Sequence, residues 1–307
     1  MAVYSVVVPL YNEEAVIEEA YARISKVMAS MGQPYEIIFV NDGSRDGTMD
    51  KARMLAGNDD KLKVLSFSRN FGHQPAITAG MDHARGRAVV VIDGDMQDPP
   101  EVMPELFAKW REGWQVVYGR RSGRKGETLF KKLTARVFYR CLNAVSEIEL
   151  PLDTGDFRLL DRQVVDAMKA LPERNRYVRG LVTWVGFRQT CVEYERKARA
   201  AGETKYPLRR MLRLASDGVT AFSQKPLKAG GIIGTLLCVS AAAVALTQLA
   251  RGLTGRSWSE TACWAAAILF AQGLVLLCAG IQNAYLARVY DEAKARPNYI
   301  VAEKIGF

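Results

Sequence analysis

Apolar and polar positions alternate in blocks over the first 120 residues of the chain. Five apolar runs are predicted strands, at 3–9, 35–40, 62–67, 88–92 and 116–118, and helical patterns lie between them at 12–31, 48–56, 75–84 and 100–112. The first of these runs is continuous, which is typical of a strand buried on both faces of a sheet. This alternation predicts an α/β fold with a mainly parallel sheet that helices cover on both sides.

Two long runs without formal charge lie nearer the C-terminus, at 229–250 and 261–287, with a short polar loop between them. A helix of roughly 20 apolar residues is long enough to cross a bilayer. The pattern therefore predicts a hairpin of two transmembrane helices over 229–287. A helical hairpin buried inside a globular domain is the alternative.

Basic residues concentrate at 120–140, which holds eight Lys or Arg and one acidic residue, with apolar residues at helical spacing. This predicts a basic amphipathic helix at about 128–145 that lies on a membrane surface. A nucleic-acid patch and a solvated helix face are the alternatives, and the two predicted spans favour lipid over nucleic acid. A second amphipathic stretch, 206–228, leads into the first uncharged run.

The predicted organisation has four parts. These are a domain over 1–205, a juxtamembrane helix over 206–228, the hairpin over 229–287 and a C-terminal tail over 288–307. No basic region precedes the first apolar run, so that run is not a targeting signal. Lys and Arg flank the hairpin, which predicts that both of its ends face the cytoplasm.

The composition narrows the chemistry. The 307 residues include 42 Lys or Arg and 33 Asp or Glu, which gives a net charge of +9. The five cysteines show no C-x-x-C spacing, and the only histidines are His73 and His83, so a zinc site is not expected. The histidines also lack the serine or cysteine pattern of a nucleophilic triad. Candidate chemistry therefore rests on carboxylates and basic side chains.

Acidic residues follow the fourth predicted strand. Asp93 and Asp95 flank a glycine directly after the run 88–92, and Gln97 lies on the same loop. Two carboxylates at a strand end can share a Mg²⁺ ion that also binds substrate phosphate oxygens. A lone D-x-D also occurs in solvated acidic turns, but ligands of parallel α/β sheets bind at the carboxyl ends of strands.

Two further polar clusters follow the first and second predicted strands. Asp42 and Ser44 follow the second strand and can hydrogen-bond a nucleobase, while Tyr11 and Glu13 follow the first and can stack on or bind a nucleoside. The alternative for both clusters is a capped helix start, a role that Asp46 fits. The sequence places all three clusters at the same edge of the predicted sheet.

Four motifs occur in order along this part of the chain: VVVPLYNEE, FVNDGSRDGT, SRNFGHQPAITAG and VVIDGDMQDPPE. Together they resemble family 2 glycosyltransferases with the GT-A fold, over roughly the first 100 residues. The segments GRRSGRKGETLFKKLTARVFYRCLN, DTGDFRLLDR and YERKARAAGETKY narrow the resemblance to polyisoprenyl-phosphate glycosyltransferases. That group includes bactoprenol glucosyltransferases, aminoarabinose-type undecaprenyl-phosphate transferases and dolichol-phosphate mannosyltransferases.

The resemblance implies that a nucleotide-sugar gives its sugar, with inversion, to the phosphate of a membrane polyprenol such as undecaprenyl phosphate. UDP-glucose is the expected donor, and Mg²⁺ or Mn²⁺ is the expected cofactor. The expected location is the bacterial inner membrane, with a cytoplasmic catalytic domain and a flippase acting downstream. Small residues in the first uncharged run also permit packing against a second copy of the chain.

The resemblance also implies roles for individual residues. Donor binding is expected at Pro9, Tyr11, Glu13, Asp42, Ser44, Arg69, Asp93 and Lys205. The metal is expected at Asp93, Asp95 and Gln97, and the acceptor phosphate at Arg121, Arg124, Lys131, Thr134 and Arg199. Asp156, Asp95 and Arg158 are expected at the reacting centre. Family members often carry Ser where this chain has Ala135, beside Thr134.

Elementary chemistry agrees with this reaction. A phosphate monoester has a second pKa of about 6, so its oxygen is already a nucleophile at neutral pH without a strong base. The protein must stabilise the leaving diphosphate and align two anions that repel each other. Asp156 would orient the acceptor or act as a base, or else form a structural pair with Arg158 or a cap.

Two other functions remain open from the sequence. A processive polysaccharide synthase shares this N-terminal pattern, but it would carry a Q-x-x-R-W stretch and more spans, which this sequence lacks. A nucleotide-binding scaffold without activity could also keep the fold.

Overall fold

An eight-stranded sheet forms the centre of this computed structural model, which describes residues 3–121, 154–174, 176–195 and 260–307. The strands are β1 (Tyr4–Leu10), β2 (Tyr35–Asn41), β3 (Leu62–Phe67), β4 (Ala88–Val91), β5 (Val116–Arg121), β6 (Thr154–Asp161), β7 (Gln189–Tyr194) and β8 (Val301–Ile305). Their order is β7-β5-β6-β4-β1-β2-β3-β8, and only β6 and β8 run antiparallel to their neighbours. The predicted mainly parallel α/β sheet, including all five predicted strands, is confirmed.

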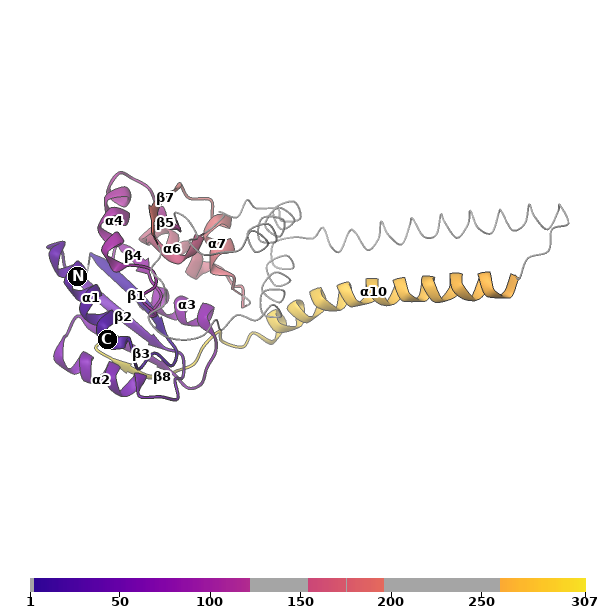
Figure 1. Cartoon of the computed structure of the whole chain (residues 1–307), viewed down its shortest axis with the longest axis horizontal. Helices are drawn as coiled ribbons and strands as arrows, with labels where there is room; N and C mark the ends of the chain where they lie inside the picture. Colours follow the sequence, from indigo (N-terminus) through magenta and orange to yellow (C-terminus); the bar gives the residue numbers. More distant parts are fainter. Residues whose placement is uncertain (1–2, 122–153, 175, 196–259) are drawn as a thin grey trace.

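Helices cover both faces of this sheet (Figure 1). On one face lie α1 (Ile17–Ser30), α2 (Thr48–Asn58) and α4 (Met103–Arg111), which follows a 3₁₀ turn (Pro100–Val102); on the other lie α3 (His73–His83), α6 (Arg162–Ala170) and α7 (Val178–Trp184). The alternation of side chains along β1 explains the two layers. Val6 and Val8 pack with Ile17 of α1, whereas Val7 packs with Ile77 of α3.

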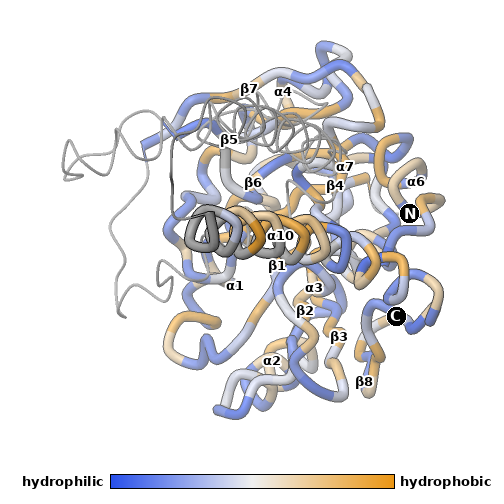
Figure 2. The backbone as a smooth tube through the Cα atoms, turned by 90° about the vertical axis from the view of Figure 1, so that its right-hand side faces the viewer, coloured by the Kyte–Doolittle hydropathy of each residue, from blue (hydrophilic) through white to orange (hydrophobic). Residues whose placement is uncertain are grey.

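The helix α10 (Glu260–Lys294) corrects one prediction. It projects from the α/β part along the long axis of the molecule (Figure 1) and is seen nearly end-on in Figure 2. None of the helices in the described ranges is long and apolar enough to cross a membrane. The predicted transmembrane helix over 261–287 is therefore wrong, and so is the multi-pass inner-membrane location that rested on it.

Other predictions for the second half of the chain lie outside the described residues. These are the basic amphipathic helix at 128–145, the juxtamembrane helix at 206–228 and the first uncharged run at 229–250.

The C-terminal segment contributes a strand that the sequence reasoning did not predict, because it treated 288–307 as a tail. β8 pairs antiparallel with β3 and forms an edge of the sheet. Tyr299, just before β8, stacks on Phe67 of β3 with ring centroids 5.2 Å apart, and its hydroxyl donates to Asp82 Oδ2 at 3.0 Å. The end of α10 and the sheet are thereby joined by a short, well-packed connection.

Strand pairing decides where the candidate site lies. β4 and β6 are antiparallel, with Val91 opposite Arg158. The same register continued by two residues sets Asp93, just past the end of β4, opposite Asp156 near the start of β6. The carboxyl ends of β1, β2 and β3 lie along the same edge, because these strands run parallel to β4.

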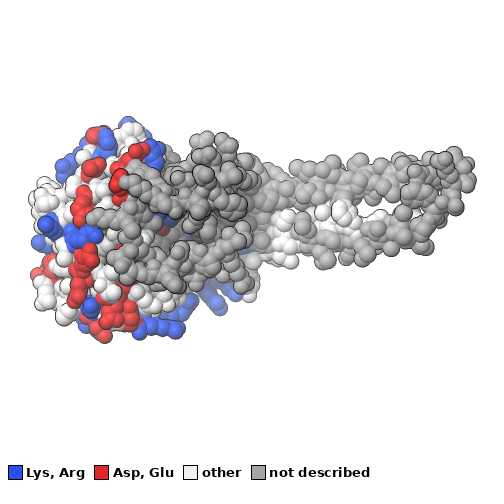
Figure 3. Space-filling view, viewed as in Figure 1, with Lys and Arg blue, Asp and Glu red and all other residues white. Residues whose placement is uncertain are grey.

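Charge on the visible face of the α/β part is mixed. Figure 3 shows acidic and basic side chains interspersed over the described atoms of this face.

Candidate active site

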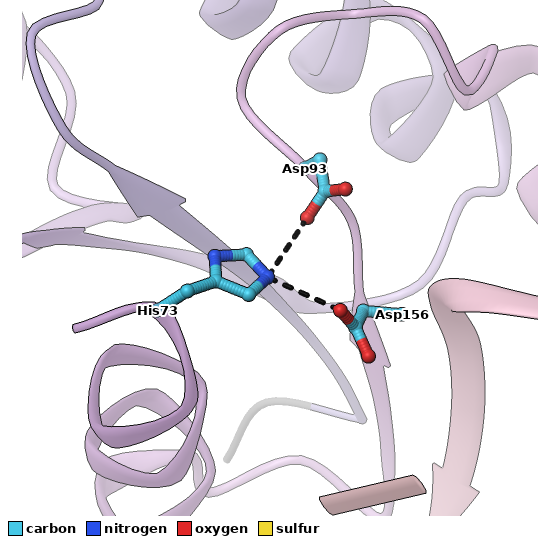
Figure 4. Close-up of side chains that lie close together, drawn as sticks. All are labelled: His73, Asp93 and Asp156. Carbon is cyan, nitrogen blue, oxygen red and sulfur yellow. Dashed lines mark hydrogen bonds and ion pairs between the residues drawn. The ribbon is translucent and has the colours of Figure 1, made fainter. Parts of the chain in front are cut away.

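Three ionisable side chains from three elements meet at the edge of the sheet (Figure 4). His73 begins α3, Asp93 follows β4 and Asp156 lies in β6. His73 Nε2 lies 3.4 Å from Asp93 Oδ1 and 3.2 Å from Asp156 Oδ2. The two carboxylates therefore share one imidazole between them.

Asp156 has a second partner on α7. The Arg179 guanidinium donates from Nε to Asp156 Oδ1 at 2.8 Å and from Nη2 to Oδ2 at 3.0 Å. Burial alone would raise the pKa of Asp156, but the charge of Arg179 and the hydrogen bonds from His73 and Arg179 hold it well below its usual range. Asp156 is thus an ionised carboxylate with both oxygens engaged.

The negative charge of Asp93 has fewer hydrogen bonds and cationic partners than that of Asp156. Its Oδ1 is buried and accepts no hydrogen bond from the described part of the chain, although His73 lies close enough for an ion pair. Burial raises the pKa of Asp93 to about 6, opposed by His73 and reinforced by the neighbouring carboxylates of Asp156, Asp98 and Asp95. Burial would lower the pKa of His73, but its hydrogen bond to Asp156 and the charges of both carboxylates raise it to about 9.

This donor set suits a divalent cation. The ligand atoms of His73, Asp93 and Asp156 all lie within 4.8 Å of one another, and Asp93 Oδ1 is an orphaned buried oxygen. A bound cation would offset the charge of Asp93, whose pKa burial raises. The predicted ligand Asp95 lies two residues further on, where its Oδ1 accepts from the Gln97 N–H at 3.2 Å.

Asp42, predicted to bind the nucleobase, is buried at the end of β2, where it fixes the following loop. Its Oδ1 accepts from the Phe71 N–H at 2.6 Å, and its Oδ2 accepts from the Gly72 N–H and Asn70 Nδ2, both at 2.9 Å. Burial raises its pKa, although these backbone donors oppose the shift. The adjacent Gly43 has φ +63°, and a Cβ there would lie 2.4 Å from the Arg69 carbonyl carbon. This turn therefore needs glycine.

The other predicted donor residues surround this loop. Tyr11 is 40% exposed at the end of β1, and Ser44 Oγ accepts from the Asn12 N–H at 3.0 Å. The Glu13 N–H donates to Thr48 Oγ1 at 2.9 Å. These hydrogen bonds join the loop after β1 to the loop after β2. Pro9 is buried within β1, and the Arg69 guanidinium lies over the Phe71 ring, 3.9 Å from its centroid.

Two predicted arginines take different positions. Arg121 Nη2 lies 3.5 Å from Asp98 Oδ2 and would lie 2.8 Å from a Cβ on Gly155, so it borders the residue next to Asp156. Arg158 is buried, and it donates from Nη2 to the Gly155 carbonyl oxygen at 2.8 Å. Burial lowers the pKa of Arg158 to about 10. In the described residues Asp156 therefore pairs with Arg179 and His73, and not with the Arg158 that the sequence offered.

Five predicted residues lie outside the described residues, and four of these were assigned to the acceptor phosphate. These five are Arg124, Lys131, Thr134, Arg199 and Lys205.

The sequence reasoning missed His73 and Arg179. His73 was considered only for zinc and triad chemistry, although its place at the first turn after β3 was a usable signal. Arg179 gave no such signal, because its partner lies 23 residues away on another element.

Comparisons with known proteins identify the family of this chain. The model of a family described as glycosyl transferase family 2 matches residues 5–168. The chain is 52% identical over 307 residues to Uncharacterized glycosyltransferase YkcC of Bacillus subtilis (strain 168), with 99% of this chain and 94% of that protein covered. It is 39% identical over 301 residues to the bactoprenol glucosyl transferase of Shigella phage SfV, with 97% of each covered.

One solved structure has a similar fold. It is the glucosyl-3-phosphoglycerate synthase from Mycobacterium tuberculosis in complex with Mn²⁺, uridine-diphosphate and phosphoglyceric acid. The TM-score is 0.51 at 23% sequence identity, covering 71% of this chain and 76% of that one. This likeness shows the fold.

Proposed function

This chain belongs to glycosyl transferase family 2 and is a glycosyltransferase, and from that premise we propose that it transfers glucose from UDP-glucose to the phosphate of a polyprenol. The similarity to a protein named bactoprenol glucosyl transferase supports both the sugar and the acceptor. The sugar's anomeric carbon leaves the diphosphate of the donor and forms a bond to an oxygen of the acceptor phosphate. UDP is the leaving group, and inversion is the expected outcome of one such displacement.

The donor side of this proposal uses the joined loops after β1 and β2. Tyr11 is exposed at a strand end, where it can stack on a base, and Asp42 holds the 70–72 loop beside it. Glu13 and Ser44 take part in the hydrogen bonds that connect the two loops. The remaining proposed donor residues are Pro9, Arg69, Asp93 and Lys205.

A divalent cation, Mg²⁺ or Mn²⁺, is part of the proposal. Asp93 would hold it, with Asp95 and Gln97 on the same loop and His73 within reach. Such a cation supplies charge that stabilises the departing diphosphate. Asp93 brings a buried, unbonded carboxylate oxygen to the site before any ligand arrives.

On the acceptor side, the protein has to orient the acceptor phosphate, and it does not need a base to deprotonate it. The phosphate of the acceptor has a second pKa of about 6, so it is largely dianionic at neutral pH and can attack directly. Arg121, which borders Gly155, and the proposed Arg124, Lys131, Thr134 and Arg199 would hold that phosphate. Asp156 is ionised and bound at both oxygens, which favours an orienting role over proton abstraction.

A single observation carries the proposal. It is the meeting of Asp93 and Asp156 at the carboxyl edge of the sheet, where His73 lies between the two carboxylates and Arg179 binds Asp156. Transfer between two anions requires positive charge at two places, because a cation must offset the charge of the leaving diphosphate while arginines hold the acceptor phosphate.

The test is a transfer assay with purified protein and undecaprenyl phosphate in detergent micelles. Radiolabelled UDP-glucose, GDP-mannose and a UDP-linked aminoarabinose serve as donors, with and without Mg²⁺ or Mn²⁺. We expect a labelled lipid with one glucose per phosphate that forms only with the metal. A long polymer would show a processive synthase instead. UDP binding without transfer from any donor would show a scaffold.

A further inference from the structure

Arg179 stands apart from the loops that the family motifs mark, yet it makes the closest contacts of Asp156. Its Nε and Nη2 donate to the two carboxylate oxygens at 2.8 and 3.0 Å. This side-on pair is the arrangement in which a planar guanidinium fixes the plane of a carboxylate. The Asp156 side chain is only 6% exposed, whereas that of Arg179 is 29% exposed.

A second cationic partner reaches the same carboxylate from a different element. His73 Nε2 of α3 lies 3.2 Å from Asp156 Oδ2 and 3.4 Å from Asp93 Oδ1. Oδ2 can stay beside His73 only while the carboxylate keeps its plane. Rotation about the Asp156 side chain would move Oδ2 away from His73 and change its position relative to Asp93.

The two elements that carry these partners are themselves joined. Gln74, next to His73 in the first turn of α3, accepts from the Val178 N–H through its Oε1 at 2.9 Å. Val178, Leu181 and Val182 of α7 are buried in the core on this face of the sheet. Backbone and side-chain contacts therefore fix the helix that carries Arg179 against the helix that carries His73.

We propose that Arg179 is a positioning residue for the transfer reaction. It sets the plane of the Asp156 carboxylate, which lies between α7, α3 and the end of β4. This inference rests on the proposed function and deepens it. Asp156 is then a negatively charged side chain held in one orientation at the reacting centre, and Arg179 of α7 fixes that orientation. Arg179 acts through Asp156, so its removal should slow the chemical step more than it weakens donor binding.

The decisive variant is Arg179→Lys, which keeps the charge and gives up the paired N–H donors. We expect kcat to fall about 100-fold, the size of effect that a misplacement of roughly 1 Å produces. The KM for the nucleotide-sugar should change less than about threefold, since ground-state binding is untouched. Arg179→Ala should lose at least as much activity.

The matched control is Arg53→Lys. Arg53 also binds a single carboxylate through two nitrogens, but at the β8 side of the sheet. Its Nε donates to Glu303 Oε1 at 3.3 Å and its Nη2 donates to Glu303 Oε2 at 3.0 Å. We expect kcat and KM within about twofold of wild type, as for other exposed pairs. Thermal unfolding of both variants separates a loss of alignment from a loss of folded protein.

A double-mutant cycle tests whether Arg179 acts on the reaction through Asp156. In an Asp156→Asn background, Arg179→Lys should add less than about threefold, because the two residues act as one unit. A full 100-fold loss in that background would overturn the proposal and indicate that Arg179 contacts a substrate directly. A raised KM with unchanged kcat would overturn it in the same way.

Crystal structures of wild type and Arg179→Lys without ligands give an outcome that does not depend on activity. We expect Asp156 Oδ2 to move away from His73 Nε2 in the variant. An unchanged carboxylate would overturn the positioning role even if the protein proved inactive with every donor. Activity on a polyprenyl phosphate with an altered carboxylate plane would support both proposals, so the two can fail separately.

Discussion

Two acidic residues at opposite ends of the same sheet, the buried Glu36 and the partly exposed Asp93, have different surroundings. Glu36, at the amino ends of the parallel strands, accepts from Ser5 Oγ at 2.6 Å, Lys63 Nζ at 2.5 Å and the Arg85 N–H at 2.6 Å. Asp93, at the carboxyl ends, keeps a buried oxygen without a hydrogen bond. The network around Glu36 satisfies a buried charge and stabilises the fold, whereas the proposed function assigns the unbonded oxygen of Asp93 to a cation.

The pKa values of the two groups carry the same contrast. Burial alone would raise the pKa of Glu36, but Lys63, Ser5 and the Arg85 N–H hold it below its usual range. Burial raises the pKa of Asp93 to about 6, and three neighbouring carboxylates reinforce the shift while His73 opposes it. Glu36 therefore stabilises the fold at one end of the sheet, and the proposed function places metal binding at Asp93 at the other end.

The variant with the largest expected effect on the contrast between Glu36 and Asp93 is Asp93→Ala. We expect transfer activity to fall about 10³-fold, or about 4 kcal/mol of transition-state stabilisation, because the cation loses its buried ligand. The free energy of unfolding should not fall, since an undercompensated carboxylate is removed. Initial rates with labelled donor and urea unfolding measure the two quantities. Wild-type rates in the variant would refute the metal assignment.

The converse variant is Glu36→Ala. It leaves the Lys63 ammonium buried without its partner, which costs about 3–5 kcal/mol of unfolding free energy. Activity per folded molecule should stay within about twofold of wild type at temperatures below the transition. Urea unfolding followed by circular dichroism measures the loss. A stable but inactive Glu36→Ala protein would contradict the division between the two ends.

The pH dependence of stability should differ in sign between the two carboxylates. Folding raises the pKa of Asp93 from 3.8 to about 6, so its ionisation costs stability as the pH rises through that window. Asp93→Asn should therefore be more stable than wild type by about 2 kcal/mol above pH 6, and the gain should vanish near pH 4.

Glu36 has the opposite dependence. Its pKa is lowered from 4.5 in the folded protein, so its contribution is present above that pH and is lost as the pH falls below it. The difference in stability between wild type and Glu36→Gln should accordingly shrink below about pH 4.5. Urea unfolding from pH 3.5 to 8 measures both series. Parallel curves for the two variants would contradict the comparison.

The smallest expected effect concerns an aromatic ring beside the network around Glu36. Lys63 Nζ lies 5.3 Å from the centroid of the Phe307 ring, which is 37% exposed. Phe307→Leu keeps most of the apolar surface and removes the ring face, which should cost about 0.5–1 kcal/mol of unfolding free energy. Activity should not change. A large loss of activity would instead link the C-terminus to the site.

The parts of this architecture that depend on local pattern were predictable from the sequence. Strands such as β1 and β2 are buried on both faces, so their apolar runs stand out. Parallel strands bring their carboxyl ends together, and that rule alone places Asp42 and Asp93 at one edge. Their roles in binding remain predictions.

The contacts that close the site were not predictable, because they join residues far apart in the chain. His73 and Asp156 are separated by 83 positions, and Arg53 and Glu303 by 250. No periodicity marks such partners. The same limit explains why β8 was missed, since VAEKI becomes a strand only through its pairing with β3. The predicted span over 261–287 is also wrong, since no helix in the described ranges is long and apolar enough to cross a membrane.

The pairing of β8 with β3 has a consequence for the order of events during synthesis. The first strands emerge from the ribosome more than two hundred residues before their partner at Val301–Ile305. Until then, β3 presents an unpaired backbone edge of the kind on which strands of other chains can add. The nascent chain therefore keeps this edge of β3 unpaired until Val301–Ile305 has been synthesised and can add to it.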